Sequence, residues 1–587
     1  MNDELREMYI EALKENPTVF DRFVSRGDVR DPVDISNPRA EAERITSRAI
    51  RSASFDRTPR YVPIVGTAGS GKTHFYWVLK DKQIDLPEVD YETVYVPSPP
   101  APVRMLLHIY TCVMDEIGLD VLKQVSERLV TAYGGMKKRF KLFGPEMDEI
   151  IGRAIRWYPG VSADVVRALI MYQMAPKEVK TIAEWWLLGE TLSEEDMEIL
   201  GVSHIIEEDD VCLATIKLLA ENVDRPIILY FDELEIPYRT FGDEAEIRLF
   251  ETIKRLYNEV RSLIIVTACL TDVWERVLDL ADPATKTRME QTANLAPFNI
   301  EDIKKFYIAA QQVFWDAQNL NPPEDLYFPL DEGIFPQIHK ASEGNPREAI
   351  RLIGDALDSI LFERPLPPPL VGAEVISKPR PPPLIVVEGF PKTEPALIKR
   401  PELIPEEEII AVDVNPGSIG GSAMASVLTV AKNLGQEEWI KVEMEYVFEA
   451  AGKRRKLTGA IISGSEPPIG IEVPSCKTFS RSGGVAAYYS ARRLNEALET
   501  NTIARGCLIV PKGTSGNKYN QIVSSMGEKA LVIELSQDEA ENLIRKARTN
   551  PIEQIFPLIK LFFPKYKKPP EKSTQETEET PETVENS

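Results

Sequence analysis

The chain has 587 residues, of which 43% are hydrophobic and 27% are charged, a balance typical of a soluble protein with several packed domains. No apolar run reaches the roughly 18 residues of a membrane-spanning helix, and the acidic start MNDELREMY differs from a signal peptide, so we expect a cytoplasmic protein without membrane contact. The formal net charge of −23 argues against nucleic-acid binding by bulk attraction, and the scattered five cysteines and four histidines argue against a disulfide framework and a histidine-based metal cluster.

The charge is unevenly distributed along the chain. Between Gly421 and Tyr566 there are 19 Lys and Arg residues against 15 Asp and Glu, a net charge of +4. The rest of the chain therefore carries −27. A mildly basic C-terminal module follows an acidic N-terminal part, and this asymmetry favours DNA as a partner of the module.

The N-terminal region leads into a phosphate-binding motif. Residues 1–58 are predicted to form a helical segment, and YVPIV is predicted to form a strand that runs into GTAGSGKT and then a helix. The motif matches the P-loop pattern G-x-x-x-x-G-K-[ST] in full, and its glycines let backbone N–H groups turn towards phosphates at the positive end of the helix. Lys72 is expected to reach the β- and γ-phosphates of ATP and Thr73 to ligate Mg²⁺. The predicted nucleotide-binding residues are Gly66, Thr67, Ala68, Gly69, Ser70, Gly71, Lys72, Thr73 and His74.

A second acidic motif follows a long helical region. The strand ETVYVPSPP ends at prolines, and residues 101–222 are predicted to form several helices, longer than an ordinary crossover connection. The apolar run PIILYF is then typical of a parallel strand buried on both faces. It ends in Asp232, which we expect to face Mg²⁺, and Glu233, which we expect to polarise the attacking water. The alternative is a buried strand with solvated acids, which the P-loop upstream makes less favoured.

The remaining N-terminal elements complete an α/β pattern. A helix places Leu249, Ile253, Leu256 and Val260 on one face, and SLIIVTACL is a further buried strand. From residue 299 to about 362 the pattern is helical and contains the turn GNPRE. Strands that alternate with helices predict a parallel sheet with right-handed crossovers.

These features resemble the AAA+ superfamily of P-loop ATPases over about residues 30–362. The resemblance rests on GTAGSGKT, the acid pair in LYFDE, the polar end of LIIVT and the turn GNPRE, which is similar to the sensor-2 motif of the initiator (origin-recognition) and STAND-like clades. It implies an ATPase core at 59–298 that contains the helical insertion, a helical lid at 299–362, and a homo-oligomeric ring or filament.

Three further catalytic residues follow from this resemblance. Arg347 is expected to reach the γ-phosphate from the lid as sensor 2, or else is a helix-start arginine without a ligand. Thr267 is the expected polar sensor, with Thr271 as the alternative, although many relatives have Asn there. Arg288 lies where relatives carry an arginine finger for a neighbour's site, and with Lys286 nearby a surface salt bridge is the alternative.

A change of composition follows the lid. Twelve prolines fall between Arg364 and Pro405, so residues 363–406 are predicted to form a semi-rigid linker, with an SH3-type ligand as the less favoured alternative. Residues 407–566 return to a globular composition. The tail at 567–587 is acidic and lacks aromatic residues, which predicts disorder.

The C-terminal module resembles the restriction-endonuclease-like fold, the PD-(D/E)xK group, in its order of strand, hairpin, strand, helix and strand. Those nucleases hold Mg²⁺ with an Asp and a Glu on adjacent strands and activate water with a Lys. Glu472 occupies the acid position in IGIEVP, but Gly459 stands at the Asp position and Pro474 at the Lys position, while Lys477 lies close by in the sequence. We therefore expect a degenerate fold that does not cleave.

A fold that has lost its metal ligands can retain a duplex-binding surface. Its phosphate contacts would be independent of sequence and sensitive to salt. An alternative for GKRRK is a solvated hairpin turn. The predicted DNA-binding residues are Lys453, Arg454, Arg455, Lys456, Arg481, Arg492 and Arg493.

The leading hypothesis is an ATPase whose nucleotide state controls assembly on, or remodelling of, duplex DNA. A second hypothesis is a protein-remodelling or signalling ATPase whose helical insertion binds a protein partner. A third is an ATP-dependent nuclease of a defence system, which the missing Asp and Lys disfavour.

Overall fold

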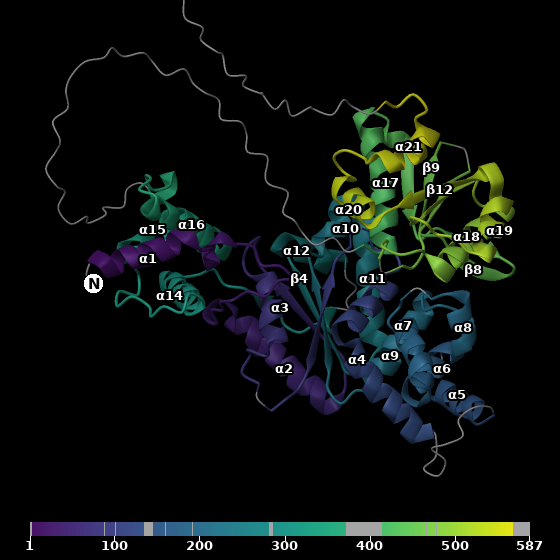
Figure 1. Ribbon diagram of the computed structural model, residues 1–587, viewed down its shortest axis with the longest axis horizontal. Coiled ribbons are helices and arrows are strands. Elements are labelled where there is room, and N and C mark those ends of the chain that lie inside the picture. The colour runs from purple at the N-terminus through teal and green to yellow at the C-terminus, as the bar shows by residue number, and fades with distance from the viewer. Residues whose placement is uncertain are drawn as a thin grey trace, which may run out of the picture.

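The computed structural model describes most of the chain (Figure 1). The predicted linker lies outside the described residues from position 371 onwards, and the predicted acidic tail lies outside them from position 568. The described ranges are 3–86, 88–99, 101–133, 145–158, 160–190, 192–280, 286–370, 414–464, 467–476 and 478–567.

The N-terminal part is built on a parallel sheet. Its strands pair in the order β2-β3-β4-β1-β5, and the pairings are parallel. β3 and β4 are buried along their whole length, as their Ile, Leu and Val runs predict for strands covered on both faces. The predicted α/β class is confirmed. The strands are β1 (Arg60–Val65), β2 (Glu92–Pro97), β3 (Ile227–Asp232), β4 (Leu263–Cys269) and β5 (Ala293–Asn294).

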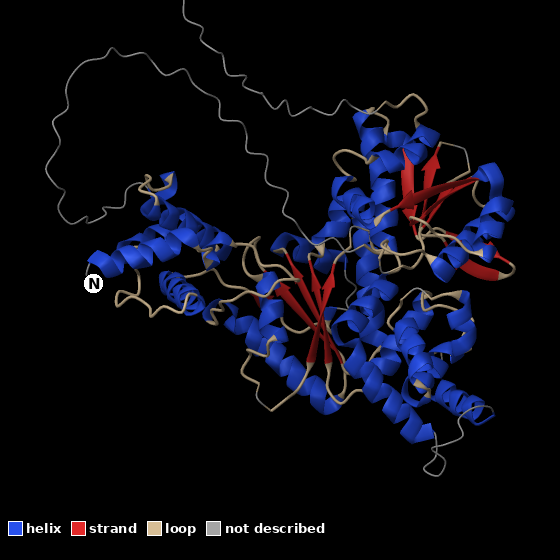
Figure 2. Ribbon diagram, in the orientation of Figure 1, coloured by secondary structure: helices blue, strands red, loops and turns tan. Residues whose placement is uncertain are grey.

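Helices cover both faces of this sheet (Figures 1 and 2). Successive side chains of β3 alternate between two apolar cores, as a period of two requires. One face is covered by α2 (Ala40–Asp56) and α3 (Lys72–Lys80), and the other by α4 (Met105–Tyr133), α11 (Asp243–Glu259) and α12 (Thr271–Leu280). The residues predicted to share one helix face are all buried in the second core: Leu249, Ile253, Leu256 and Val260.

The connection from β2 to β3 holds the predicted helical insertion. Its helices pack around α4 and share one apolar core with the sheet, in which Leu169, Leu187 and Leu200 are fully buried. In the described part of residues 101–222 the chain is largely helical, as the sequence predicts. After α4 they are α5 (Pro145–Trp157), α6 (Ala163–Met174), α7 (Lys177–Leu187), α8 (Glu194–Leu200) and α9 (Asp209–Glu221).

The helices of the predicted lid also bind the start of the chain. Tyr9 meets Trp315 edge-on at a ring-centroid distance of 5.1 Å and donates its hydroxyl to the Asn321 carbonyl at 2.8 Å. The predicted N-terminal segment is therefore divided, because its first helix packs on the lid and α2 packs on the sheet. The helices of this unit are α1 (Asp3–Glu15), α14 (Ile300–Ala317), α15 (Phe335–Ser342) and α16 (Pro346–Leu361).

The C-terminal part has a mixed sheet in the order β12-β11-β10-β9-β6. β6, β9 and β10 are antiparallel neighbours, whereas β10, β11 and β12 run parallel. The strands are β6 (Ile440–Met444), β9 (Gly459–Ser463), β10 (Ile469–Glu472), β11 (Arg505–Pro511) and β12 (Ala530–Leu535). One face packs on α17 (Pro416–Asn433), α20 (Gln537–Lys546) and α21 (Phe556–Phe562), and the other on α18 (Gly484–Glu499) and α19 (Asn517–Met526).

The basic segment GKRRK forms a strand after its glycine, whereas the alternative considered for it was a solvated hairpin turn. The segment KVEMEYVFEA that precedes it is interrupted at Glu445, whose φ of 50° separates β6 from a hairpin. In that hairpin β7 (Val447–Ala450) pairs with β8 (Lys453–Lys456), and the turn is formed by Ala451 and Gly452. Arg454, Arg455 and Lys456 therefore lie in a strand and alternate between its two faces instead of gathering at a tip.

The two parts share an apolar core. Ala101 and Val103, at the start of the insertion, pack with α17 and the C-terminal sheet. Gly421 of α17 comes so close that a Cβ placed on it would lie 2.5 Å from the Cβ of Ala101. Only glycine permits this approach, so the start of the insertion is fitted against α17.

A second contact comes from α10 (Glu235–Phe241), the helix that follows β3. Phe241 packs against the C-terminal core, and Arg548 donates a hydrogen bond to the Thr240 hydroxyl. The helix that follows the predicted acids Asp232 and Glu233 is thereby in direct contact with the C-terminal part.

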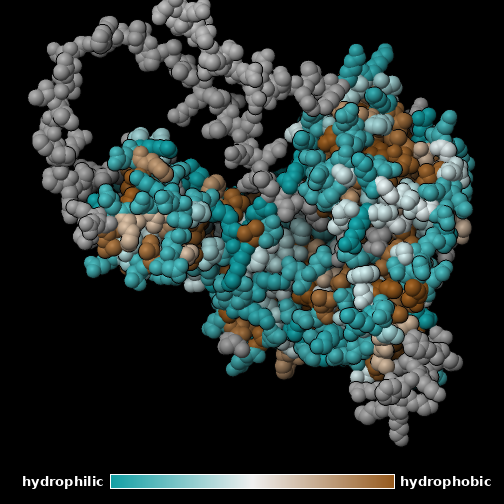
Figure 3. Space-filling view, in the orientation of Figure 1, coloured by the Kyte–Doolittle hydropathy of each residue, from teal (hydrophilic) through white to brown (hydrophobic). Residues whose placement is uncertain are grey.

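In the described stretches no helix is long and apolar enough to cross a membrane. Figure 3 shows hydrophilic residues over much of the visible face of both parts. All five cysteines are free thiols.

Replacing Gly421 by Val should weaken the docking of α17. The added side chain would overlap Ala101, and overpacking of this kind costs about 1–3 kcal/mol. Gly152→Ala in α5 is the control, because nothing lies within 4 Å of its Cβ position and alanine favours a helix. Urea unfolding measures both variants. Wild-type stability of Gly421→Val would contradict the close contact.

Candidate functional site

The loop between β1 and α3 has the backbone of a phosphate cradle. Gly69 and Gly71 have φ angles of 77° and 94°, which glycine adopts without steric cost. Gly71 is also the N-cap of α3. The positive end of this helix therefore opens directly onto the loop.

Lys72, the first residue of α3, folds back over the loop. Its Nζ donates to the carbonyl oxygens of Gly66 (3.2 Å) and Thr67 (2.9 Å). Burial lowers the pKa of the ammonium, while the carboxylates of Asp232 and Glu235 act to raise it. A phosphate is a stronger partner for this cation than two neutral carbonyls, so a bound nucleotide would draw Lys72 towards itself.

The acid at the end of β3 faces the P-loop. Thr73 Oγ1 donates to Asp232 Oδ2 at 2.6 Å, and the Tyr95 hydroxyl donates to the same oxygen at 3.1 Å. Asp232 is 1% exposed; burial raises its pKa, and the hydrogen bonds from Thr73 and the Glu233 backbone oppose the rise. A hydroxyl and a carboxylate side by side are hard oxygen ligands, so these residues fit Mg²⁺. The ion, when bound, neutralises charge on the transferred phosphoryl group.

Two further carboxylates line the same cavity. Glu233 is exposed and has a φ of 55°, which is uncommon for a residue with a side chain. Glu235, absent from the predicted site, has one carboxylate oxygen buried without a hydrogen-bond partner in the described part of the chain. Burial raises the pKa of Glu235. The spacing D-E-x-E in DELE was the signal that could have identified it.

The lid reaches the P-loop through the start of α16. Asn345, the N-cap of this helix, donates Nδ2 to the Ala68 carbonyl at 2.7 Å. The Arg347 backbone N–H donates to the Gly69 carbonyl at 3.3 Å, and a Cβ on Gly69 would lie 2.7 Å from that of Arg347. The structure thus brings GNPRE and the P-loop together, and Arg347 lines the cavity.

Loop, acids and lid surround a cavity of about 310 Å³. Its wall combines the polar P-loop residues with apolar side chains from the N-terminal segment and the lid. This combination fits a nucleotide whose phosphates lie on the loop and whose base contacts the apolar side chains. The apolar wall includes Val33, Ile35, Phe298, Phe306 and Ile350, none of which carried a motif in the sequence.

His74 joins α3 to the N-terminal segment. Its Nδ1 lies 2.9 Å from Asp31 Oδ2, and its Nε2 lies 2.9 Å from Asp34 Oδ1. Burial acts to lower the pKa of the imidazole, but the two carboxylates outweigh it and raise the pKa to about 9. His74 was predicted to bind the nucleotide; it lines the cavity, but both ring nitrogens are engaged by these acids.

Two predicted catalytic residues, Thr267 and Arg288, lie outside the cavity wall, and so does Thr271, the alternative to Thr267. Thr267 is fully buried in β4, with its hydroxyl 3.4 Å from that of Tyr61, and the alternative Thr271 is the first residue of α12. Arg288 is exposed and donates to Asn258 Oδ1 at 2.5 Å. Their roles stay predictions.

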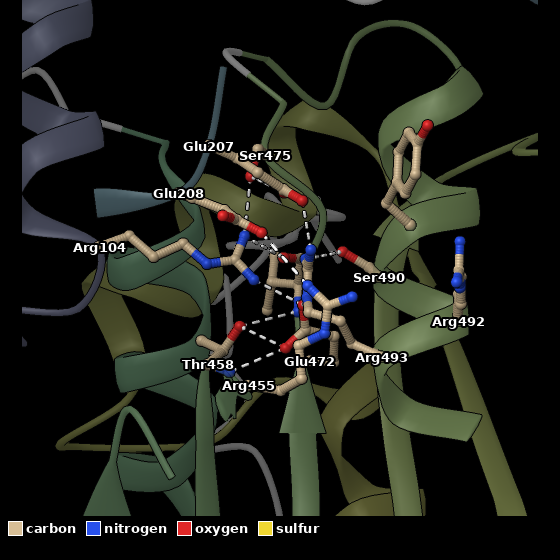
Figure 4. Close-up of polar contacts among 12 residues, drawn as sticks. Arg104, Glu207, Glu208, Arg455, Thr458, Glu472, Ser475, Ser490, Arg492 and Arg493 are labelled. Carbon is tan, nitrogen blue, oxygen red and sulfur yellow. Dashed lines mark hydrogen bonds and ion pairs between the residues drawn. The ribbon is translucent and has the colours of Figure 1, made fainter. Parts of the chain in front are cut away.

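The acid of the C-terminal domain is closed off (Figure 4). Glu472, at the end of β10, is fully buried and accepts hydrogen bonds from Arg104 (2.5 Å), Arg493 (2.6 Å) and the Thr458 backbone N–H (2.8 Å). Burial acts to raise the pKa of this carboxyl, but Arg493 and Arg104 hold it below the usual value. Two guanidinium groups thus neutralise the acid that a nuclease would use to hold Mg²⁺.

The other nuclease positions offer no replacement ligands. A Cβ on Gly459 would lie 2.7 Å from Met424 Sδ and 3.0 Å from the Glu443 carbonyl oxygen, so an Asp side chain there would have to displace Met424. Pro474 has no amine, and Lys477 lies outside the described residues. Within the ranges that the structure describes, no group of three or more His, Cys, Asp or Glu is placed to hold a metal ion.

The predicted DNA-binding residues fall into two sets. Arg454, Arg481 and Arg492 are exposed, and the side chain of Lys453 lies outside the described part. The other three form ion pairs within the chain, as Arg492 also does with Glu496, and the DNA contacts of all these residues stay predictions. These pairs are Arg493 with Glu207 and Glu472, Arg455 with Glu208, and Lys456 with Asp209.

Known proteins give only distant resemblances. No protein-family model and no curated protein matches the chain. The structure of the Aeropyrum pernix ORC2 protein in ADPNP–ADP complexes aligns with 91% of this chain and 98% of its own, at 11% identity and a TM-score of 0.32. The ORC1 protein of the same organism, in complex with DNA, aligns with 59% of this chain and 67% of its own, at 13% identity and a TM-score of 0.29.

A Walker-type ATPase of Pyrococcus abyssi aligns with 59% of this chain and 73% of its own, at 13% identity and a TM-score of 0.28. TM-scores this low carry no conclusion about the present chain, whose site is defined by its own residues.

The pairing of His74 with two acids predicts a pH-dependent stability. Its folded pKa of about 9 exceeds the ordinary 6.5, so the stabilisation is fully present below pH 6.5 and is lost as the pH rises through about 9. We expect the free energy of unfolding to fall by up to about 3 kcal/mol over that interval, and His74→Asn to lack this fall. Urea titrations at several pH values measure it. Equal slopes for both proteins would contradict the pairing.

Replacing Glu235 by Gln should tighten the binding of metal-free ATP. The change removes a buried negative charge close to Lys72, and a triphosphate is repelled by that charge. With EDTA present we expect the Kd of ATP to fall about tenfold, equivalent to about 1.4 kcal/mol, and with excess Mg²⁺ the difference should shrink. Calorimetry measures both, with the exposed Glu178→Gln as control. An unchanged Kd in EDTA would remove Glu235 from the site.

Proposed function

We propose that this chain is an ATPase of the AAA+ type, similar to the initiator clade, that binds ATP with Mg²⁺ between the P-loop and the lid. The observation that carries the proposal is the 2.6 Å hydrogen bond from Thr73 to Asp232 beside Lys72. A hydroxyl, a carboxylate and an ammonium in this arrangement have the chemistry of phosphoryl transfer. The strand order supports the proposal, because it gathers the P-loop and Asp232 at the carboxyl edge of one sheet.

Each residue at the cavity has one task in this proposal. Lys72 exchanges its carbonyl partners for β- and γ-phosphate oxygens, and Glu233 orients the attacking water and accepts its proton. Arg347 approaches the γ-phosphate from the lid, since its backbone is already bonded to Gly69. The γ-phosphate would thus add a contact between the lid and the loop to the hydrogen bonds of Asn345 and Arg347, and hydrolysis would remove that contact. Arg288, exposed beyond this cavity, would complete the site of a second copy in a homo-oligomer.

The proposed partner of the C-terminal domain is duplex DNA. The region from Gly421 to Tyr566 is net basic in an acidic chain, and Arg454, Arg481 and Arg492 are exposed on it. The domain is proposed to be a restriction-endonuclease-like fold without cleavage activity, because Glu472 is buried under two arginines. Binding would then be through phosphates and would weaken with salt.

A second candidate is the remodelling of a protein partner. The insertion exposes several large apolar side chains, which on a soluble domain mark places where another protein can bind. They are Leu119 (55% exposed), Trp157 (73%), Trp185 (47%) and Ile199 (47%).

ATP turnover by the purified full chain, with and without duplex DNA, tests the proposal. We expect turnover to rise severalfold with DNA at low salt. Lys72→Ala removes the phosphate cation and Glu233→Gln the base, and each should lower turnover by about 100-fold or more. Glu178→Gln, an exposed acid of the insertion, serves as the control.

Turnover that persists in both site variants would show that the chemistry lies elsewhere. If both site variants lose turnover, but wild-type turnover does not respond to DNA and the wild type binds no DNA at low salt, DNA is removed from the proposal. The protein-remodelling candidate is then favoured.

A further inference from the structure

Consecutive acids of the insertion lie on the basic face of the C-terminal domain (Figure 4). We define the acidic strap as residues 207–209. Its first two residues end the connection from α8 to α9, and its third is the first residue of α9. The strap is negative at each of its positions, and each acid meets a different cation. Glu207 pairs with Arg493 of α18, Glu208 with Arg455 of β8, and Asp209 with Lys456 of β8.

The inner pair is built into the fold. The side chains of Glu207 and Arg493 are 10% and 14% exposed, and Arg493 also holds the buried Glu472. Breaking such a pair leaves a buried charge without compensation, which is strongly destabilising. This pair therefore anchors the strap permanently.

The outer pairs are of a different kind. Glu208 is 68% exposed and lies 3.3 Å from Arg455, which is 27% exposed. Lys456 is 44% exposed and lies 2.8 Å from Asp209, which is 23% exposed, and a second acid, Glu445, holds it at 3.1 Å. Ion pairs this open to water are weak and are screened by salt. They can exchange one anionic partner for another at little cost.

The row of cations continues beyond the strap. Glu496 of α18 pairs with Arg492 at 3.0 Å and with Arg455 at 3.6 Å, so the exposed Arg492 adjoins the strap's partners. Arginine and lysine donate hydrogen bonds to phosphate oxygens and to carboxylate oxygens through the same N–H groups. The cations that pair with this run of carboxylates can therefore also bind the phosphates of a nucleic-acid backbone.

We propose that the acidic strap takes the place of DNA phosphates on this face, and that duplex DNA competes with Glu208 and Asp209 for Arg455 and Lys456. The inference rests on the proposed DNA contact and adds its regulation. With the strap in place the affinity for DNA is held low. When DNA displaces the outer acids, Arg455 and Lys456 join Arg492 in binding it, and the inner pair keeps the domain docked.

The strap is also joined to the nucleotide site by the chain itself. Asp209 begins α9, and this helix leads through a short connection into β3, which ends at Asp232. One continuous segment of the chain thus runs from the strap to the acid at the cavity.

The experiment is a DNA-binding titration of the full chain by fluorescence anisotropy of a labelled blunt duplex, at several salt concentrations. The strap variant is Glu208→Gln with Asp209→Asn, which removes two negative charges from exposed or half-exposed positions. We expect its Kd at low salt to be about tenfold below that of the wild type. The slope of log K against log salt should steepen by up to about 2, because two more phosphates are engaged at roughly 0.9 each.

Two controls separate the strap from a general change of charge. Glu178→Gln with Glu190→Gln removes the same charge from exposed positions of the same insertion and should leave the Kd nearly unchanged. Arg455→Gln with Lys456→Gln, added to the strap variant, should reverse the gain. Glu208→Gln alone, at the most exposed acid, should give a smaller gain in the same direction and answers the question if the double variant does not fold.

The outcomes distinguish this inference from the function on which it rests. If the wild type binds DNA and the strap and control variants bind equally well, competition by the strap is overturned and the DNA contact stands. A gain that survives the loss of Arg455 and Lys456 also overturns it. If no form binds DNA at low salt and ATP turnover ignores DNA, the proposed DNA contact itself fails.

Discussion

The nucleotide cavity depends on one close approach, that of Thr73 to Asp232, which are 159 positions apart in the sequence and 2.6 Å apart in the structure. Thr73 lies in α3, which follows β1, and Asp232 ends β3; these two strands are not neighbours, because β4 lies between them, and α3 contacts both β3 and β4. The buried carboxylate of Asp232 needs donors, and it receives them from Thr73, Tyr95 and the Glu233 backbone, which come from three elements. The site therefore forms only when the whole sheet and its helices are packed.

Elements that carry their own local signal could be predicted from the sequence. The P-loop, the buried strands and the apolar face at 249–260 are determined by residues close together in the chain, and each lies where it was expected. The apolar wall of the cavity could not be predicted, because Val33 and Phe306 are ordinary apolar residues until the fold brings them to one place. His74 is similar, since its partners Asp31 and Asp34 lie 43 and 40 positions away without a recognisable motif.

Charge patterns were the least predictable feature. GKRRK is a basic run, yet Arg455 and Lys456 meet acids that lie 247 positions away. Such partners are set by tertiary packing alone. Glu472 shows the same dependence, because an isolated buried carboxylate costs several kcal/mol and the fold must supply positive charge. Arg104 and Arg493 together provide the two positive charges that a divalent metal ion would otherwise bring.

Arg104 belongs to the N-terminal part of the chain, yet it completes the charge balance inside the C-terminal domain. A copy of that domain without residues 101–104 would contain a half-neutralised carboxylate and an uncovered surface where Ala101 now meets Gly421. The packing of the C-terminal domain therefore depends on the first residues of the insertion. A transfer of this domain to another protein would have to carry those residues with it, and a side chain added at Gly421 would have to be accommodated at Ala101.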